Sequence, residues 1–184
     1  LWTYLHNRSI NVGKYTFFGY SFIPPSPFGL KDWEKYDVSR FVDPGCTHPF
    51  EGMRSVEPDF DPEYDNIKED LDELTNSEDL TNAIFLFHVP PYQTPLDRAA
   101  LDGKMIDYVP LDVHIGSIAI QRFIEARQPL LTLHGHVHEA YSITGTWRTM
   151  IGDTHAFSAA FDQDRLFIVR FDPGQLSDAT HYIL

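Results

Sequence analysis

Two short apolar runs, each preceded by a segment with helical periodicity, constrain the fold of this chain most strongly. The runs are residues 83–87 (AIFLF) and 130–133 (LLTL), and such short continuous apolar runs are expected of strands buried on both faces. The two preceding segments each place apolar residues on one helical face: Ile67, Leu71 and Leu74, then Ile120, Phe123 and Ile124. Ser117 is a suitable N-cap for the second helix, and Pro129 ends it. Alternating helices and short strands buried on both faces predict an α/β fold with parallel strands.

The remaining segments predict further strands around a long irregular region. Residues 10–23 are rich in β-branched and aromatic side chains, which predicts a hairpin with its turn at Gly13 and Lys14. Residues 36–64 have neither the helical nor the strand period and contain many Pro, Gly and Asp residues, so a long irregular loop is expected. Four later β-like runs predict a meander that closes the sheet: residues 141–144, 147–151, 157–161 and 166–171. One domain over residues 1–184 accommodates all of these elements.

Charge and composition exclude several classes of partner. The net charge of -13 leaves few Lys and Arg side chains to neutralise phosphates, so a long nucleic acid is not expected as a partner. No apolar run approaches the roughly 20 residues needed to cross a bilayer. Cys46 is the only cysteine, which excludes an intrachain disulfide and favours a cytoplasmic location.

Histidines follow both apolar runs. His88 comes directly after the first run, and His134, His136 and His138 follow the second. In open α/β sheets, ligands bind at the carboxyl ends of the strands. Residues two apart in an extended segment point to the same side, so His136 and His138 are expected to project together, with Gly135 allowing a tight turn. Neutral imidazoles suit Zn, Fe, Mn and similar ions, although exposed loop histidines would leave the same pattern.

Two sequence blocks resemble a known family. Residues 87–92 (FHVPPY) resemble the penultimate histidine block of calcineurin-like metallophosphoesterases, and residues 135–138 (GHVH) resemble their terminal Gly-His-x-His block. The resemblance covers most of the chain. Four further segments resemble one bacterial or archaeal branch of this family: residues 19–21, 27–28, 94–97 and 114–117. The resemblance implies part of a four-layer α/β/β/α sandwich.

The resemblance also implies a chemistry. His88 and His136 would bind one ion of a pair of divalent metals, such as Mn, Fe or Zn, and His138 would bind the other. The expected function is hydrolysis of a small phosphomonoester or phosphodiester by a metal-activated water. The alternative from another class is a non-catalytic interaction module on the same fold, since this fold also serves as a scaffold where the ligands have been lost.

Several motifs of the family do not occur in this chain. The family also uses an Asp-x-His block, a Gly-Asp block and an Asn-His-Asp or Asn-His-Glu block, whose histidine protonates the leaving group. We expect these blocks upstream of Leu1, so the catalytic histidine is not assigned here and the isolated chain is expected to be a weak or inactive catalyst. Uncovered sheet edges would favour a homo-oligomer or a companion N-terminal segment.

Four further residues are candidates for supporting roles. His134 could orient the metal-binding histidines or serve the fold alone. Gly135 is a candidate because it adjoins them. His114 could contact the substrate or the metal site, or it could be an ordinary loop residue ahead of a helix cap. Arg54 could bind a phosphate through two hydrogen bonds, or it could be one of many exposed arginines.

Overall fold

The fold described here is a computed structural model, and it describes residues 2–184. The helices are α1 (Ile67–Thr75), α2 (Ile118–Arg127) and α3 (Ala140–Thr144), with two short 3-10 helices, η1 (Pro95–Asp97) and η2 (Leu176–Asp178). The strands are β1 (Arg8–Val12), β2 (Tyr15–Tyr20), β3 (Ala83–Phe87), β4 (Met105–Ile106), β5 (Val109–Pro110), β6 (Leu131–His134), β7 (Arg148–Ile151), β8 (Thr154–Ser158), β9 (Phe167–Arg170) and β10 (Thr180–Ile183).

One mixed sheet of six strands organises the chain, in the order β1-β2-β3-β6-β8-β7. The four central strands β2, β3, β6 and β8 are parallel, and the edge strands β1 and β7 are antiparallel to their neighbours. The β1–β2 hairpin turns at Gly13 and Lys14, as expected, and Gly13 has a φ of 63° that favours glycine. The predicted α/β class is confirmed.

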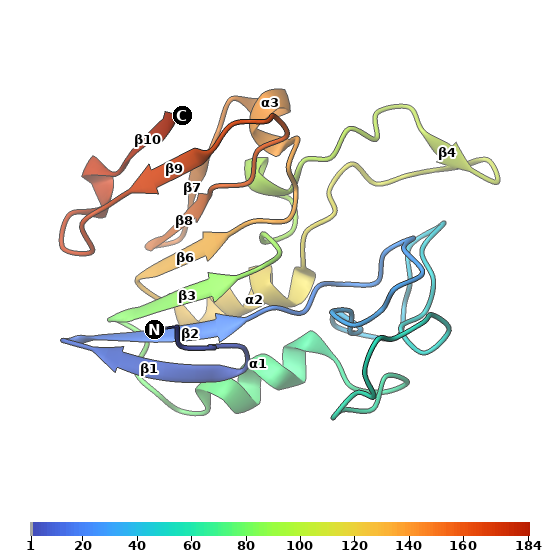
Figure 1. The fold of residues 1–184 in the computed structure, drawn as a ribbon, viewed down its shortest axis with the longest axis horizontal. Helices are drawn as coiled ribbons and strands as arrows, with labels where there is room; N and C mark the ends of the chain where they lie inside the picture. Colours follow the sequence, from blue (N-terminus) through green and yellow to red (C-terminus); the bar gives the residue numbers. More distant parts are fainter. Residues whose placement is uncertain (1) are drawn as a thin grey trace.

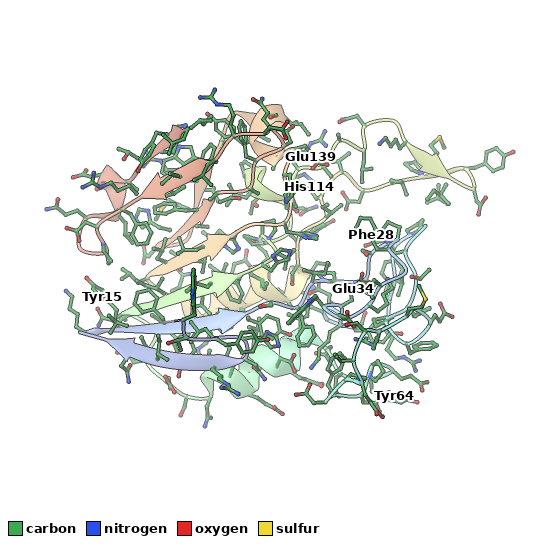
Figure 2. All side chains as sticks on the ribbon, in the orientation of Figure 1. Tyr15, Phe28, Glu34, Tyr64, His114 and Glu139 are labelled. Atoms are coloured by element: carbon green, nitrogen blue, oxygen red, sulfur yellow. The ribbon has the colours of Figure 1, made fainter. Side chains whose placement is uncertain are left out.

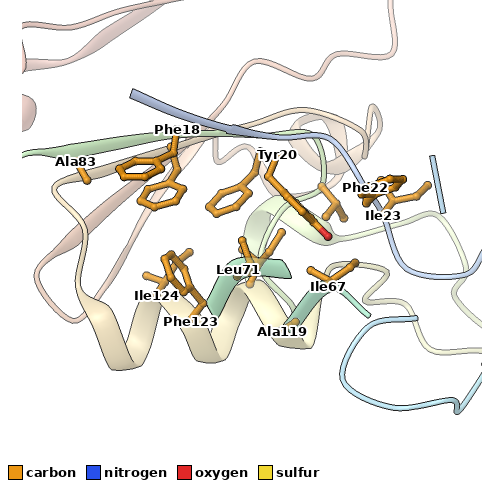
Figure 3. Packing of buried hydrophobic residues seen from close by; sticks show 14 of the residues in the cluster. Phe18, Tyr20, Phe22, Ile23, Ile67, Leu71, Ala83, Ala119, Phe123 and Ile124 are labelled. Carbon is orange, nitrogen blue, oxygen red and sulfur yellow. The ribbon is translucent and has the colours of Figure 1, made fainter. Parts of the chain in front are cut away.

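Helices α1 and α2 pack against one face of this sheet (Figures 1 and 3). Their buried apolar side chains meet those of β2 and β3, including Phe18, Leu71, Phe85 and Ile120. Asn66 caps the start of α1, and its side chain accepts a hydrogen bond from the Glu69 amide. Both helices therefore follow the apolar pattern of the sequence, because burying that stripe on the sheet stabilises them more than helical propensity does.

The opposite face of the sheet is only partly covered. A separate two-stranded sheet of β9 and β10 packs there, where Phe167 joins Ile84 and Leu131 in a second apolar cluster. The predicted meander is therefore corrected: β7 and β8 extend the main sheet, but β9 and β10 do not. Leu86 is 42% exposed on this face, so β3 is not buried on both faces along its whole length.

Residues 141–144 form part of a helix and not the expected β-like run. The α3 helix is closed by hydrogen bonds from the Ile143 amide to the Glu139 carbonyl (3.0 Å) and from the Gly145 amide to the Tyr141 carbonyl (2.8 Å). Gly145 ends it with a φ of 68°, as glycine does at many helix C-termini. A four-residue run is too short for its alternation to separate strand from helix.

Two irregular segments extend beyond the carboxyl ends of β2, β3 and β6 (Figure 1). The first, called here the loop layer, is residues 21–66, in which no helix or strand lies between β2 and α1. The second, called here the arm, is residues 99–116 and contains the small β4–β5 hairpin. Within residues 2–184, every helix is too short or too polar to traverse a bilayer.

Candidate functional site

The strand order brings His88 and His136 together. Strands β3 and β6 are adjacent and parallel, with Leu86 opposite Leu133. The segments that follow these two strands therefore leave the sheet at the same edge. The Gly135 amide then donates a 2.9 Å hydrogen bond to the His88 carbonyl, which ties the two loops together. The His136 Nδ1 and His88 Nε2 atoms lie 3.2 Å apart, and the ring centroids are 5.0 Å apart.

A strained turn sets the direction of His136. Its φ is 70°, in the left-handed region that a residue with a Cβ rarely adopts, and the Val137 amide donates a 2.9 Å hydrogen bond to the Gly135 carbonyl. This hydrogen bond spans two residues, as in the rare γ-turn with positive φ. Val137 is buried and anchors the turn. Strain of this kind is found where the surrounding structure fixes a functional side chain.

The structure changes the reason for a glycine at position 135. Gly135 does not have a positive φ, and a Cβ there would lie at an ordinary contact distance of 3.5 Å from the His88 carbonyl oxygen. The tight turn instead occurs at His136. The expectation that Gly135 allows the tight turn is therefore corrected, because the positive φ of the turn belongs to His136.

Both imidazoles of this pair are neutral near pH 7. Burial lowers the pKa of His136 to about 4, and the neighbouring His88 and His138 act in the same direction. The pKa of His88 is also lowered, first by desolvation of its ring and then by His138, although the residue as a whole remains exposed. A neutral imidazole has a free lone pair, which is the form that binds a metal ion.

The spacing of the pair fits two ligands of one ion. Nitrogens about 2.1 Å from a tetrahedral ion lie roughly 3.4 Å from each other, close to the 3.2 Å between His88 and His136. The set is incomplete, because residues 2–184 contain no group of three or more His, Cys, Asp or Glu side chains placed to hold a metal ion. His138 is exposed and lies near enough to lower the pKa of both other histidines.

His134 supports the pair from below. It is buried, its Nδ1 lies 3.0 Å from the Val89 carbonyl oxygen, and its Nε2 lies 2.8 Å from the Thr132 hydroxyl. Its ring stacks on Phe87, and burial lowers its pKa to about 4. Through the contact with Val89, His134 holds in place the segment that carries His88. The His134 ring itself is buried.

His114, in the arm, is held by a buried carboxylate. Asp97 is fully buried, and its oxygens accept hydrogen bonds from His114 Nδ1 (2.7 Å) and from the amides of Gln93, Thr94 and Gly116. Burial raises the pKa of Asp97 despite these bonds. Because Nδ1 is engaged, Nε2 is the nitrogen of His114 that remains for another partner.

His114 and His136 line the same cavity. This cavity, of about 360 Å³, lies between the loop layer and the arm, and Glu139 and Phe28 also line it. Figure 2 shows Phe28 on the loop layer and His114 and Glu139 across from it. Sequence reasoning did not identify Asp97 or Glu139, although Thr94 three residues before Asp97 is the pattern of a capping box, which the structure contains.

Arg54 lies elsewhere in the loop layer. Its guanidinium donates to the Pro49 carbonyl (3.2 Å) and lies over the Phe60 ring, 5.0 Å from its centroid. Burial lowers its pKa. Arg54 does not line the cavity that contains His136, so its contacts are those of a residue that holds the loop layer together.

Comparisons with known proteins support the fold and no more. No protein-family model matches the chain, and no curated protein matches it. A crystal structure whose description gives no protein name is similar with a TM-score of 0.50 and 15% identity, covering 98% of this chain and 52% of its own. The crystal structure of TT1561 of Thermus thermophilus aligns with a TM-score of 0.46 and 15% identity, over 97% of this chain and 57% of its own. The chain thus spans about half the length of these structures, and it shares its α/β fold with the first of them.

Proposed function

We propose that the full-length protein is a metal-dependent phosphoesterase of the calcineurin-like type, and that this chain supplies part of its metal site. The observation that carries the proposal is the pair of neutral imidazoles, His88 and His136, with nitrogens 3.2 Å apart at the carboxyl ends of adjacent parallel strands. Both residues lie in the two sequence blocks that resemble this family.

The histidines of this site have different roles in the proposal. His88 and His136 would together bind one divalent ion, each through a ring nitrogen, and His138 would bind a second ion nearby. Two such ions lower the pKa of a bound water and offset the charge of a phosphate ester. His134 fixes the position of the His88 segment through the Val89 carbonyl, which matters because supporting contacts orient metal-binding histidines. The remaining ligands would come from other parts of the full-length protein.

The direct test measures turnover and metal content together. The full-length protein is assayed with bis(p-nitrophenyl) phosphate and Mn²⁺, and bound metal is counted by mass spectrometry after dialysis. His136→Ala and His88→Ala are each expected to lower kcat/KM by more than about 100-fold, since losing even a supporting contact of a metal ligand costs roughly 10–100-fold. Both variants should also retain less metal.

A matched control separates the site from general damage. His155 lies on β8 opposite Leu131, the first residue of β6, and so at the other end of the strands from His136. His155→Ala should keep both activity and metal. If the parent protein shows no turnover with Mn²⁺, Fe²⁺ or Zn²⁺, or if His136→Ala keeps full activity, the proposal is wrong.

A non-catalytic interaction module is the second candidate. It is favoured by the lack of any three-residue metal group within residues 2–184. The same experiment distinguishes the two, because an interaction module would retain no metal after dialysis and would hydrolyse no ester.

A further inference from the structure

The cavity beside His136 has a wall from each of the two irregular segments. The loop layer contributes one wall, which includes Phe28 and Phe41, and the arm contributes the other, which includes Ile106. The walls touch at Gly45, where a Cβ would fall 2.2 Å from Ile106 Cδ1. The φ of Gly45 is 85°, in the left-handed region that favours glycine. A bound molecule would therefore lie between the two segments.

Most of the cavity wall is apolar. His136 and His114 are among its polar residues, and apolar side chains of both segments form much of the remainder, among them Pro27, Phe28 and Leu101. Apolar walls with a few fixed polar groups are the usual form of a small-molecule site. A phosphate ester whose phosphoryl group lay near His136 would therefore place its alcohol part against apolar side chains.

The charges around the cavity are all negative. Four carboxylates line it, from Asp37, Asp43, Asp112 and Glu139, and no Lys or Arg does so among the residues that the structure describes. Asp112 accepts a hydrogen bond from the Tyr92 hydroxyl. Burial raises the pKa of the Asp43 carboxyl, and the nearby Asp112 raises it further. An additional anionic group on the occupant would lack a cationic partner here and would meet carboxylates instead.

We propose that this cavity binds the alcohol part of the substrate and selects an apolar group that carries no anionic charge of its own. The proposal rests on the phosphoesterase function and specifies its substrate class. Phosphate esters of uncharged or cationic aromatic and alkyl alcohols fit the cavity, whereas nucleotides with more than one phosphate do not. Phe28 and its apolar neighbours favour an apolar group, and the carboxylates of Asp43 and Asp112 disfavour an anionic one.

The test is a binding measurement that does not require turnover. Phosphonates are suitable probes because their P–C bond resists hydrolysis. Binding of methylphosphonate, phenylphosphonate, 4-(aminomethyl)phenylphosphonate and 4-carboxyphenylphosphonate to the Mn²⁺-loaded full-length protein is measured by calorimetry. Phenylphosphonate should bind at least about 10-fold more tightly than methylphosphonate, as filling an apolar site typically gives. The aminomethyl probe should keep this gain, and the carboxyphenyl probe should lose it.

Two variants locate the effect in the cavity. Phe28 is 67% exposed, so Phe28→Ala should fold normally while losing most of the preference for the phenyl group. Phe50→Ala is the matched control, because Phe50 is an exposed phenylalanine of the same loop layer that does not line the cavity. Asp43→Asn should improve binding of the carboxyphenyl probe by several-fold and leave that of the phenyl probe unchanged.

The outcomes separate this inference from the proposed function. Equal binding of the methyl and phenyl probes, or tight binding of the carboxyphenyl probe, would overturn the inference even if bis(p-nitrophenyl) phosphate is hydrolysed with dependence on His136. Conversely, the expected order of binding in a protein that hydrolyses no ester would sustain the cavity's selectivity and remove the phosphoesterase proposal.

Discussion

Two regions of the molecule are stabilised by different interactions. One is the main sheet together with helices α1 and α2, and the other is the loop layer. On the sheet, stabilisation is apolar: Phe18 stacks on Phe85 with centroids 4.7 Å apart, and Phe123 contacts Phe85 edge-on. In the loop layer, charged side chains are buried. Lys31 and Glu34 form a 2.6 Å ion pair with almost no exposure, and Lys35 pairs with Asp70 of α1 at 2.8 Å.

This difference bears on how each region responds to change. Apolar packing is non-directional and depends on the volume that the side chains fill. A buried ion pair depends on both partners being present, since removing one leaves an uncompensated charge. The loop layer also carries one wall of the cavity, which includes Phe28 and Asp43.

The largest expected effect is in the sheet core. Phe85→Ala should lower the free energy of unfolding by about 4 kcal/mol, because it removes a fully buried ring and leaves a cavity among other aromatic rings. Urea unfolding followed by fluorescence measures this. Phe41→Ala, which truncates a phenylalanine that is 70% exposed, should change stability by less than about 0.5 kcal/mol. Similar losses in both variants would show that exposure does not distinguish the two regions.

The buried pair of the loop layer provides the second prediction. Lys31→Met should cost about 3 kcal/mol, because Glu34 stays buried without its cation. The double variant Lys31→Met with Glu34→Leu should recover more than half of that loss, as apolar replacements of buried pairs often do. The recovery would be incomplete, since Glu34 also accepts hydrogen bonds from Ser26. A double variant that is less stable than Lys31→Met would show that the pair is not the source of the cost.

The sequence predicted the first region much better than the second. Helices α1 and α2 followed from the spacing of residues such as Leu71 and Ile120, because that spacing reports which face is buried. Strand β3 followed from a short continuous apolar run. The contacts of the loop layer join residues far apart in the sequence, such as Asp37 and the Ser117 hydroxyl, and no local period reports them. The four-residue run in α3 was misassigned for a related reason, since it is too short to show a period.

The candidate site divides in the same way. The juxtaposition of His88 and His136 could be predicted, because parallel strands bring the residues after them to one edge of the sheet. The left-handed backbone of His136 could not be predicted, because glycine favours that conformation and the neighbouring residue is Gly135. Nor could the burial of Asp97, which depends on amides from two separate loops.

Helix caps give a third, smaller contrast between the regions. Asp37 of the loop layer reaches α2 and accepts hydrogen bonds from the Ile118 amide (2.7 Å), the Ala119 amide (3.2 Å) and the Ser117 hydroxyl (2.5 Å). Asp37→Ala should cost about 2 kcal/mol, at the upper end for a helix cap. Asn66→Ala removes the local cap of α1, a single 3.0 Å bond to the Glu69 amide, and should cost about 1 kcal/mol. Thermal unfolding of both variants checks the order, and a smaller cost for Asp37→Ala would argue that the distant cap adds nothing.

The smallest effect is a change in the pH dependence of stability, with opposite sign at two aspartates of the loop layer. Burial raises the pKa of Asp37, more than its hydrogen bonds from Ser117, Ala119 and Ile118 lower it. The folded state therefore binds this proton more tightly than the unfolded chain does. As pH falls through the raised pKa toward the usual value of 3.8, the wild type should gain stability relative to Asp37→Asn.

Asp32 should show the reverse. It is exposed to solvent, and hydrogen bonds from the Ser55 hydroxyl (2.6 Å) and amide (2.7 Å) lower its pKa below 3.8. Its stabilisation is present above that value and is lost as pH falls through the lowered pKa, so the wild type should lose stability relative to Asp32→Asn on acidification. Urea unfolding of the wild type and both variants at pH 7, 5 and 3 compares the two trends. If the wild type loses stability on acidification relative to both variants, burial does not outweigh hydrogen bonding at Asp37.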